Sequence, residues 1–371
     1  MLSYWEQQSF HKYDHIIIGA GIVGLSTAIE LRVKYPGSRV LVLERGLLPT
    51  GASTKNAGFA CMGSVTELLA DLRHMSEDEV VALFERRKRG LELLRDRLGD
   101  DNIGYAATGS HELISKQEEY ALDKIDYLNS LLKPVTGQDA FRRVDEKLTD
   151  LGFAQAHITA LIENTCEGAL HTGMMMRSLV DYAMQQGIEI KTGVEVVSYE
   201  EDADGVTVYT GSGIDFKCDT LCICTNAFTK SLLPEADVVP GRGQILITKP
   251  ISGLKLKGIF HFNEGYYYFR EIDGRILIGG GRNEDMQGEA TDELTVTDTI
   301  QNKLEEKLRE IIIPNTPFEV DMRWAGIMAF GDTKQPVIQQ FSEHVFGAFR
   351  MGGMGVAIGS LAGKELVALI N

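Results

Sequence analysis

Three glycines at a characteristic spacing are the part of this sequence that most directly suggests chemistry. They occur in Gly19-Ala-Gly21-Ile-Val-Gly24. A glycine at the first position permits a tight turn, and one at the second lets the backbone approach a pyrophosphate. The third lets a helix pack closely on a strand, and the N-terminus of that helix offers N–H groups and a positive dipole to phosphate. The pattern therefore predicts a dinucleotide-binding turn, provided that it lies between a strand and a helix.

The residues around the glycines predict the strands and the helix that such a turn needs. Residues 15–19 form a short β-branched run that stops at glycine, residues 22–33 show a helical apolar period, and residues 39–44 form a second buried strand. This order is a parallel βαβ unit of the Rossmann type. The unit ends in Glu44, whose carboxylate can accept hydrogen bonds from ribose hydroxyls and would repel a 2′-phosphate.

The segment after the second strand resembles the flavin-contacting loop of a known family. Gly51-Ala-Ser-Thr-Lys-Asn-Ala-Gly58 is similar to the pattern Gly-Ala-Ser-x-x-Asn-x-Gly of the D-amino-acid-oxidase-like (DAO) family. From the residues alone, the segment is equally a turn that feeds another helix. Cys222-Ile-Cys-Thr-Asn-Ala227, Arg242-Gly-Gln244 and Tyr267-Tyr-Phe-Arg270 extend the resemblance along most of the chain. Within the family, the chain most resembles the group that contains gamma-glutamylputrescine oxidase.

The resemblance implies that FAD is the cofactor and that it is bound non-covalently, because no cysteine or histidine occupies a familiar covalent-flavin position. Arg45 either contacts the adenosine or is solvated. At the start of the last helix, backbone N–H groups would face the pyrimidine edge of the flavin and stabilise negative charge there. The residues that the resemblance assigns to FAD are Gly19, Gly21, Gly24, Glu44, Arg45, Ser53, Lys55, Asn56, Ala57, Gly58, Val196, Thr225, Asn226, Ala227, Gly352, Gly353, Met354, Gly355 and Val356.

The substrate end of the site is expected near three consecutive tyrosines at 266–268. Strand alternation places the middle one, Tyr267, on the face opposite its neighbours. We expect Tyr267 to face the flavin pocket, the alternative being simple sheet packing. Amino-acid-oxidising relatives carry a carboxylate-binding arginine where this chain has Met328, so Arg270 or Arg350 would have to take that role. The predicted catalytic residues are therefore Tyr267, Arg270 and Arg350, and amines without an α-carboxylate are expected to react faster.

Other residues that could do chemistry have weaker support. His171 is more readily explained as a structural residue, and His261 is a plausible pocket residue without a motif. Cys222 and Cys224 share one face of a predicted strand, where buried thiols explain them better than metal binding, and no metal site is predicted. Five cysteines in a long chain are typical of a reducing compartment, so we expect a cytoplasmic protein.

The composition argues against nucleic acid as a partner and against a membrane span. The 371 residues carry a formal net charge of −16, which argues against nucleic acid, because phosphate binding depends on Lys and Arg. The sequence contains no apolar run of about 18 residues, so no membrane span is expected. Residues 1–14 lack the apolar centre of a signal peptide. The expected partners are a small amine or amino acid and oxygen or another electron acceptor, and a partner subunit remains open.

The fold class that follows is α/β, with a Rossmann-type FAD-binding domain and an α+β substrate domain that has a large, mostly antiparallel sheet. The motif positions predict a discontinuous FAD-binding domain of residues 1–82, 152–240 and 324–371, and a substrate domain of residues 83–151 and 241–323.

The expected reaction is oxidation of a C–N bond to an imine by hydride transfer to flavin N5, with water hydrolysing the imine. Four alternatives stay open: a dehydrogenase that reduces a quinone or a protein, an oxidase of a hydroxy acid, the FAD-binding subunit of a larger complex, and a tRNA-modifying flavoprotein, which the negative charge disfavours.

Overall fold

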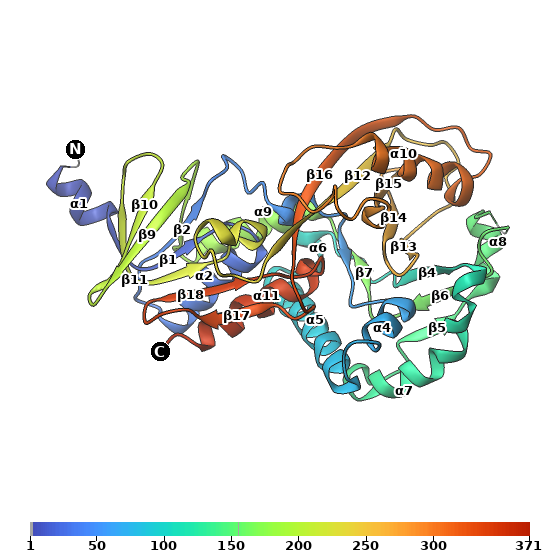
Figure 1. Cartoon of the computed structure of the whole chain (residues 1–371), viewed down its shortest axis with the longest axis horizontal. Helices are drawn as coiled ribbons and strands as arrows, with labels where there is room; N and C mark the ends of the chain where they lie inside the picture. Colours follow the sequence, from blue (N-terminus) through green and yellow to red (C-terminus); the bar gives the residue numbers. More distant parts are fainter. Residues whose placement is uncertain (1–2, 155) are drawn as a thin grey trace.

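The computed structural model describes residues 3–154 and 156–371, and within them the chain forms two eight-stranded sheets and one two-stranded sheet. The two large sheets lie at opposite ends of an elongated molecule (Figure 1), and both chain termini lie at the end that holds the first sheet. This α/β architecture, with large mixed sheets, confirms the predicted fold class.

The first sheet is built around the predicted βαβ unit. Its central strands are parallel to one another, and their residues are almost all buried, as expected for strands covered on both faces. Its spatial order is β17 (Val337–Gln340), β18 (Val345–Phe349), β11 (Phe216–Ile223), β1 (Lys12–Ile18), β2 (Val40–Glu44) and β8 (Glu189–Thr192), with β10 (Gly205–Thr210) on β11 and β9 (Val196–Asp202) on β10.

Two helices, α2 (Ile22–Lys34) and α11 (Gly355–Ala368), pack on this sheet, and α5 (Glu77–Leu98) packs against α11. A Cβ atom on Gly90 of α5 would lie 2.3 Å from the backbone oxygen of Ala357 in α11, so only glycine allows the two helix backbones to approach this closely. Ser76 and Glu79, three residues apart, predict a capping box at the start of α5. The box is present, since the Ser76 side chain accepts from the Glu79 N–H and the Glu79 carboxylate accepts from the Ser76 N–H.

The second sheet is mostly antiparallel, as predicted. One of its faces packs against α10 (Asp298–Lys307) and the turn Leu308–Ile312, and aromatic rings such as Phe260 and Phe269 fill that interface. Its spatial order is β16 (Val320–Phe330), β12 (Val239–Thr248), β15 (Arg275–Gly280), β14 (Tyr267–Ile272), β13 (Ile259–Phe262), β4 (Ser110–Ile114), β6 (Ala160–Asn164) and β5 (Phe141–Arg143).

The remaining elements connect or flank the two sheets. The sequence of residues 117–132 predicts one helical stretch, and the structure has a 3₁₀ helix over Lys116–Lys124 followed by α7 (Ile125–Thr136). None of the helices in the two described ranges is long and apolar enough to cross a bilayer. The other elements are α1 (Tyr4–Phe10), α3 (Ala52–Lys55), α4 (Val65–Asp71), α6 (Asp100–Ile103), α8 (Leu148–Leu151), α9 (Thr172–Gln185), β3 (Phe59–Ala60) and β7 (Gly168–Ala169).

Two segments join a different part of the molecule from the one their motif positions suggest. β6 falls in the segment 152–240, expected in the FAD-binding domain, but it pairs with β4 and β5 of the second sheet. Most of α5 falls in the segment 83–151, expected in the substrate domain, but it packs against α11. Strand pairing and helix packing determine which domain a segment belongs to. We therefore propose that α5 belongs to the FAD-binding domain and β6 to the substrate domain.

Candidate active site

A cavity of about 630 Å³ lies between the carboxyl ends of the first sheet's parallel strands and one face of the second sheet. Ligands of α/β proteins bind at this edge of a parallel sheet, and the volume is within the range of about 300–1,000 Å³ typical of small-molecule and cofactor sites. Seventeen of the residues that the sequence assigns to FAD line it: Gly19, Gly21, Glu44, Arg45, Ser53, Lys55, Asn56, Ala57, Val196, Thr225, Asn226, Ala227, Gly352, Gly353, Met354, Gly355 and Val356.

The glycine turn between β1 and α2 has the geometry that a pyrophosphate needs. Gly19 has a φ of +104°, which favours glycine. A Cβ atom on Gly24 would lie 1.9 Å from the Gly19 oxygen, so Gly24 acts by helix packing and does not line the cavity. A Cβ atom on Gly21 would meet only the Ser53 side chain, with the nearest atom, Oγ, at 3.0 Å. Gly21 therefore borders open space, and the residues present fit a dinucleotide.

Glu44 at the end of β2 both supports this turn and faces the cavity. Its carboxylate accepts hydrogen bonds from the N–H groups of Ala20 and Gly46, each at 3.0 Å. A carboxylate oxygen accepts more than one hydrogen bond, so ribose hydroxyls can still bind there. The Arg45 guanidinium stacks 3.7 Å from the centre of the Phe228 ring. Arg45 therefore lines the expected adenosine end of the cavity.

The loop around Asn56 is held by hydrogen bonds to the rest of the protein. Asn56 Oδ1 accepts from the Gly58 N–H and from Thr172 Oγ1, both at 2.9 Å. Gly58 has a φ of +76°, and its Cβ would lie 2.3 Å from the Leu170 oxygen. Gly58 thus shapes the loop without lining the cavity, whereas Asn56 and Ala57 do line it.

Arg270 and Arg350 do not lie where the sequence places them. Arg270 donates to the backbone oxygens of Gly58 at 3.0 Å and Leu170 at 2.7 Å, and burial lowers its pKa. Arg350 pairs with the Asp237 carboxylate and donates to the Gln335 oxygen. Neither side chain lines the cavity. The expected carboxylate-binding role is corrected for both, because neither side chain reaches the cavity and each already donates to the protein's own acceptors.

The turn before α11 lines the cavity. Gly352 and Gly353 have φ values of +58° and +83°. Asn226 Oδ1 accepts from the Arg350 N–H at 3.1 Å and so ties the end of β11 to this turn. The first N–H groups of a helix have no partner within the helix, and those of Gly355 and Val356 begin α11 beside the cavity.

The tyrosine alternation is present, but its orientation is the reverse of the expected one. Tyr267 is buried on the face that packs against α10, where its ring stacks on Phe262 and its hydroxyl donates to Glu284 at 2.8 Å. Tyr266 and Tyr268 line the cavity. The Tyr268 ring lies over Gly279, whose Cβ would come within 2.6 Å of it. Alternation separates the two faces of a strand but does not say which face meets the cofactor.

Several cavity residues were not predicted from a motif. His261 is buried and lines the cavity, with Nε2 at 3.4 Å from Ser110 Oγ and Nδ1 at 3.9 Å from Glu67 Oε2. Glu67 forms a capping box with Ser64, a pattern that predicts the start of a helix. The pattern does not indicate that Glu67 also lines the cavity. Glu264 and Arg282 also line the cavity, and nothing in their immediate sequence marks them as site residues.

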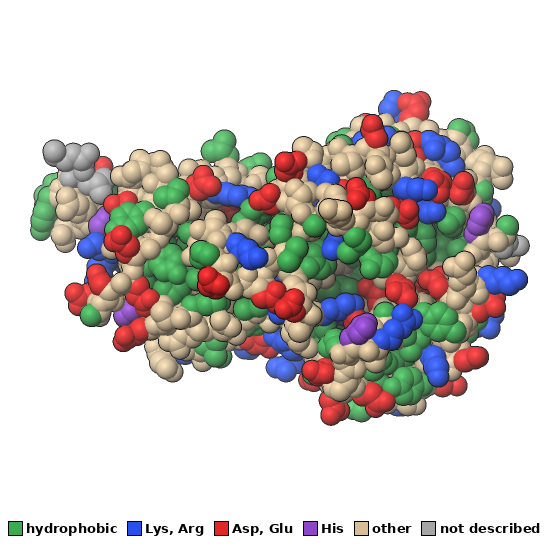
Figure 2. All heavy atoms as spheres, viewed as in Figure 1, with side chains coloured by type: hydrophobic (Ala, Val, Ile, Leu, Met, Phe, Trp, Pro, Cys, Tyr) green, Lys and Arg blue, Asp and Glu red, His purple; other side chains and the backbone are tan. Residues whose placement is uncertain are grey.

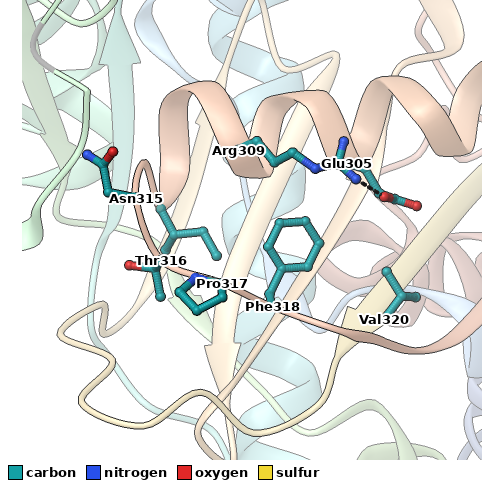
Figure 3. Close-up of a pocket in the computed structure, with 8 residues that line it drawn as sticks. Glu305, Arg309, Asn315, Thr316, Pro317, Phe318 and Val320 are labelled. Carbon is teal, nitrogen blue, oxygen red and sulfur yellow. Dashed lines mark hydrogen bonds and ion pairs between the residues drawn. The ribbon is translucent and has the colours of Figure 1, made fainter.

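A second hollow and the surface charges give no reason to place the functional site elsewhere. A shallow hollow beside α10 contains Phe318 and an ion pair between Glu305 and Arg309, so its charged groups are already satisfied (Figure 3). Within the described ranges, no group of side chains could hold a metal ion. On the face shown in Figure 2, acidic and basic side chains are interspersed, without a large basic patch.

Comparisons with known proteins place the chain in a family. It is 24% identical to the probable oxidoreductase OrdL of Haemophilus influenzae, over 96% of this chain and 82% of that protein. It is 26% identical to the glycine oxidase of Pseudomonas aeruginosa, over 84% of this chain and 81% of the relative. The fold is similar to that of the L-proline dehydrogenase from P. horikoshii, with a TM-score of 0.79 and 19% identity over 97% of this chain and 94% of that one.

The finer resemblance to the gamma-glutamylputrescine oxidase group stays a prediction. The model of the DAO family, described as FAD dependent oxidoreductase, matches residues 14–369. This match spans the glycine turn, Glu44, the Asn56 loop and the turn before α11, and these line or shape one cavity. The chain therefore belongs to the DAO family of FAD-dependent oxidoreductases, and FAD is its cofactor.

Proposed function

We propose that the protein oxidises the C–N bond of a small amine or amino acid to an imine. The observation that supports this most is the combination of carboxylates and aromatic rings in the same cavity as the glycine turn. Glu67, Glu264, Tyr266 and Tyr268 all line this cavity. Carboxylates and aromatic faces both attract a cationic nitrogen. Bound FAD would supply the hydride acceptor for oxidation at the carbon next to that nitrogen.

The protein's share of this reaction is binding, orientation and proton transfer. Tyr268 and Phe59 form an edge-to-face aromatic pair, with centroids 5.6 Å apart, that limits the orientations available to a small substrate. An ammonium group must lose a proton before its C–N bond can be oxidised. We propose that this proton goes to Glu67 Oε2, with His261 Nδ1 beside it at 3.9 Å.

A second candidate is oxidation of a hydroxy acid. The position of His261 favours it, because oxidation of a hydroxyl group benefits from a base beside the cavity. The L-2-hydroxyglutarate dehydrogenase of Escherichia coli is 22% identical over 80% of this chain and 72% of its own length. In either case we propose a cytoplasmic protein that passes electrons to oxygen or another acceptor, and a partner subunit could supply that acceptor.

Matched substrates separate the two candidates. Purified protein loaded with FAD is mixed without oxygen with glycine, sarcosine and glycolate, and with ethylamine and ethanol, while the flavin absorbance is followed. We expect each amine to bleach the flavin at least about tenfold faster than its hydroxyl counterpart, a difference of about 1.4 kcal/mol in activation free energy. Faster bleaching by glycolate than by glycine would favour the hydroxy-acid reaction instead.

We also expect FAD to be released intact by heat or acid. Among the cysteines, Cys61 and Cys224 line the cavity, and burial raises the pKa of both thiols, that of Cys224 to about 12. Thiols with raised pKa values stay protonated at neutral pH, and the thiolate is the reactive form. After denaturation, flavin should therefore appear in the supernatant. Flavin that remains with the precipitated protein would contradict non-covalent binding.

A further inference from the structure

Among the described residues that line the cavity, Arg282 is the one with a buried side-chain polar atom that has no hydrogen-bond partner. It begins a short 3₁₀ turn, Arg282–Glu284, directly after β15, and it lines the cavity. Among the described residues, no hydrogen-bond acceptor or ion-pair partner lies within reach of its guanidinium, and its Nε is buried without a partner. Arg242 is paired with Glu289, Arg350 with Asp237, and Arg270 donates to backbone oxygens, whereas Arg45 is exposed to solvent.

An unpaired guanidinium at a partly buried position is costly for the folded protein. Burial lowers the pKa of Arg282, although Tyr266 and Glu289 act in the opposite direction. A buried donor without an acceptor loses its hydrogen bonds to water and gains none in return. An anionic ligand would restore these bonds, which indicates that the acceptor comes from outside the chain.

The place of the guanidinium indicates what that acceptor is. It stacks 4.0 Å from the centre of the Phe330 ring. Its Nη1 lies 3.2 Å from where a Cβ of Gly241 would be, and Gly241 pairs across the sheet with Met328. Phe330 lies two residues after Met328 on β16, so both side chains face the same side. The Arg282 guanidinium therefore lies on the same wall as Met328, although it comes from a different strand end.

The segment that carries Arg282 is fixed in place by buried groups. Arg242 donates to the Glu289 carboxylate at 2.7 and 3.0 Å, and Gln244 donates to it at 2.9 Å. These contacts attach the loop after Arg282 to β12. The Phe330 ring supports the guanidinium itself, so that binding a planar anion costs it less conformational entropy.

We propose that Arg282 binds a carboxylate of the substrate, so that the substrate is an amine that also carries a carboxylate. This inference rests on the proposed oxidation of a C–N bond and narrows its substrate class. The flat guanidinium fork matches a carboxylate with two parallel hydrogen bonds. Glu67 and Glu264 line the same cavity and suit the cationic nitrogen of such a zwitterion. The preference for amines without an α-carboxylate, expected from Met328, is thereby reversed.

Binding of benzoate and benzamide to the FAD-loaded protein tests this inference without turnover. The two ligands have nearly the same shape, and only benzoate is anionic. Calorimetry and the visible flavin spectrum should show that the natural protein binds benzoate at least about tenfold more tightly than benzamide, as expected for a charge-assisted hydrogen bond. In Arg282→Gln this preference should vanish, and in Arg282→Lys part of it should remain because lysine keeps the charge but not the fork.

Arg309→Gln is the matched control. Its guanidinium also lies over a phenylalanine ring, 5.5 Å from the centre of Phe318, but outside the cavity (Figure 3). It should leave the preference for benzoate unchanged. Equal binding of benzoate and benzamide by the natural protein would overturn the inference, and so would a preference that survives in Arg282→Gln with FAD bound.

The outcomes separate this inference from the proposed function. If amines bleach the flavin while Arg282→Gln keeps the preference for benzoate, C–N oxidation stands and the role of Arg282 is wrong. If no amine bleaches the flavin while the preference disappears in Arg282→Gln, the anion site stands and the proposed reaction is wrong. Because the comparison within the natural protein needs no variant, the test holds even if Arg282→Gln fails to fold.

Discussion

Replacing Gly21 with valine is expected to give a folded protein that retains little FAD. A Cβ atom at this position meets only the flexible Ser53 side chain, so the fold can adapt by a small movement of one hydroxyl. The pyrophosphate, however, needs this space and the N–H groups behind it. Loss of two charge-assisted hydrogen bonds, each of about 1.5–3 kcal/mol, would weaken FAD binding by roughly 10² to 10⁴-fold.

Gly24→Ala is the matched control for this prediction. Its Cβ would lie 1.9 Å from the Gly19 oxygen, so the variant should lose stability of the apoprotein itself, whereas Gly21→Val should not. Flavin absorbance per protein, FAD titration and urea unfolding of the apoprotein distinguish the two effects. Full flavin occupancy in Gly21→Val would mean that the pyrophosphate lies elsewhere.

The cofactor end of this site could be predicted from the sequence because its signals are local. Gly19, Gly21 and Gly24 act through backbone space within one turn, and Glu44 follows at the end of the next strand. Each residue type is dictated by the space or the hydrogen bond at its own position. Such signals do not depend on which distant segment folds against them.

The substrate end depends on contacts between distant segments, and the sequence could not provide these. Arg270 was expected to bind substrate, but it bonds to Gly58 and Leu170, more than 90 residues away along the chain. Tyr267 was expected to face the cavity, but Phe262 and α10 provide the apolar surface on which its ring packs. For Arg282 the informative observation is a missing partner, which only the folded structure can reveal.

The helix expected over residues 117–132 shows the same limit at the level of backbone structure. The sequence indicated one helical stretch, whereas the chain forms a 3₁₀ helix that passes into α7 at Ile125. A 3₁₀ segment and an α-helix share similar side-chain spacing over one or two turns, so the periodicity cannot separate them. Element type was therefore predictable here, and hydrogen-bond pattern was not.

Removing the charge of Arg242 is expected to cost the protein about 3–5 kcal/mol of its free energy of unfolding. Arg242 and Glu289 are only 4% and 1% exposed, and their side chains share two hydrogen bonds. Arg242→Met leaves the Glu289 carboxylate buried with the Gln244 amide as its remaining side-chain donor. Breaking one side of a buried ion pair is strongly destabilising, because the other charge stays buried.

The double variant Arg242→Met with Glu289→Leu tests the physical cause. Replacing both charges by apolar groups of similar size is often nearly neutral, so the double variant should recover most of the lost stability. Urea unfolding at a fixed, saturating FAD concentration measures both variants, since bound cofactor itself stabilises the native state. A double variant as unstable as the single one would show that Arg242 acts mainly through Thr295 and the Gly288 oxygen, its other acceptors. In that case the loop would be held by neutral contacts, and Arg282 would keep its position without the buried ion pair.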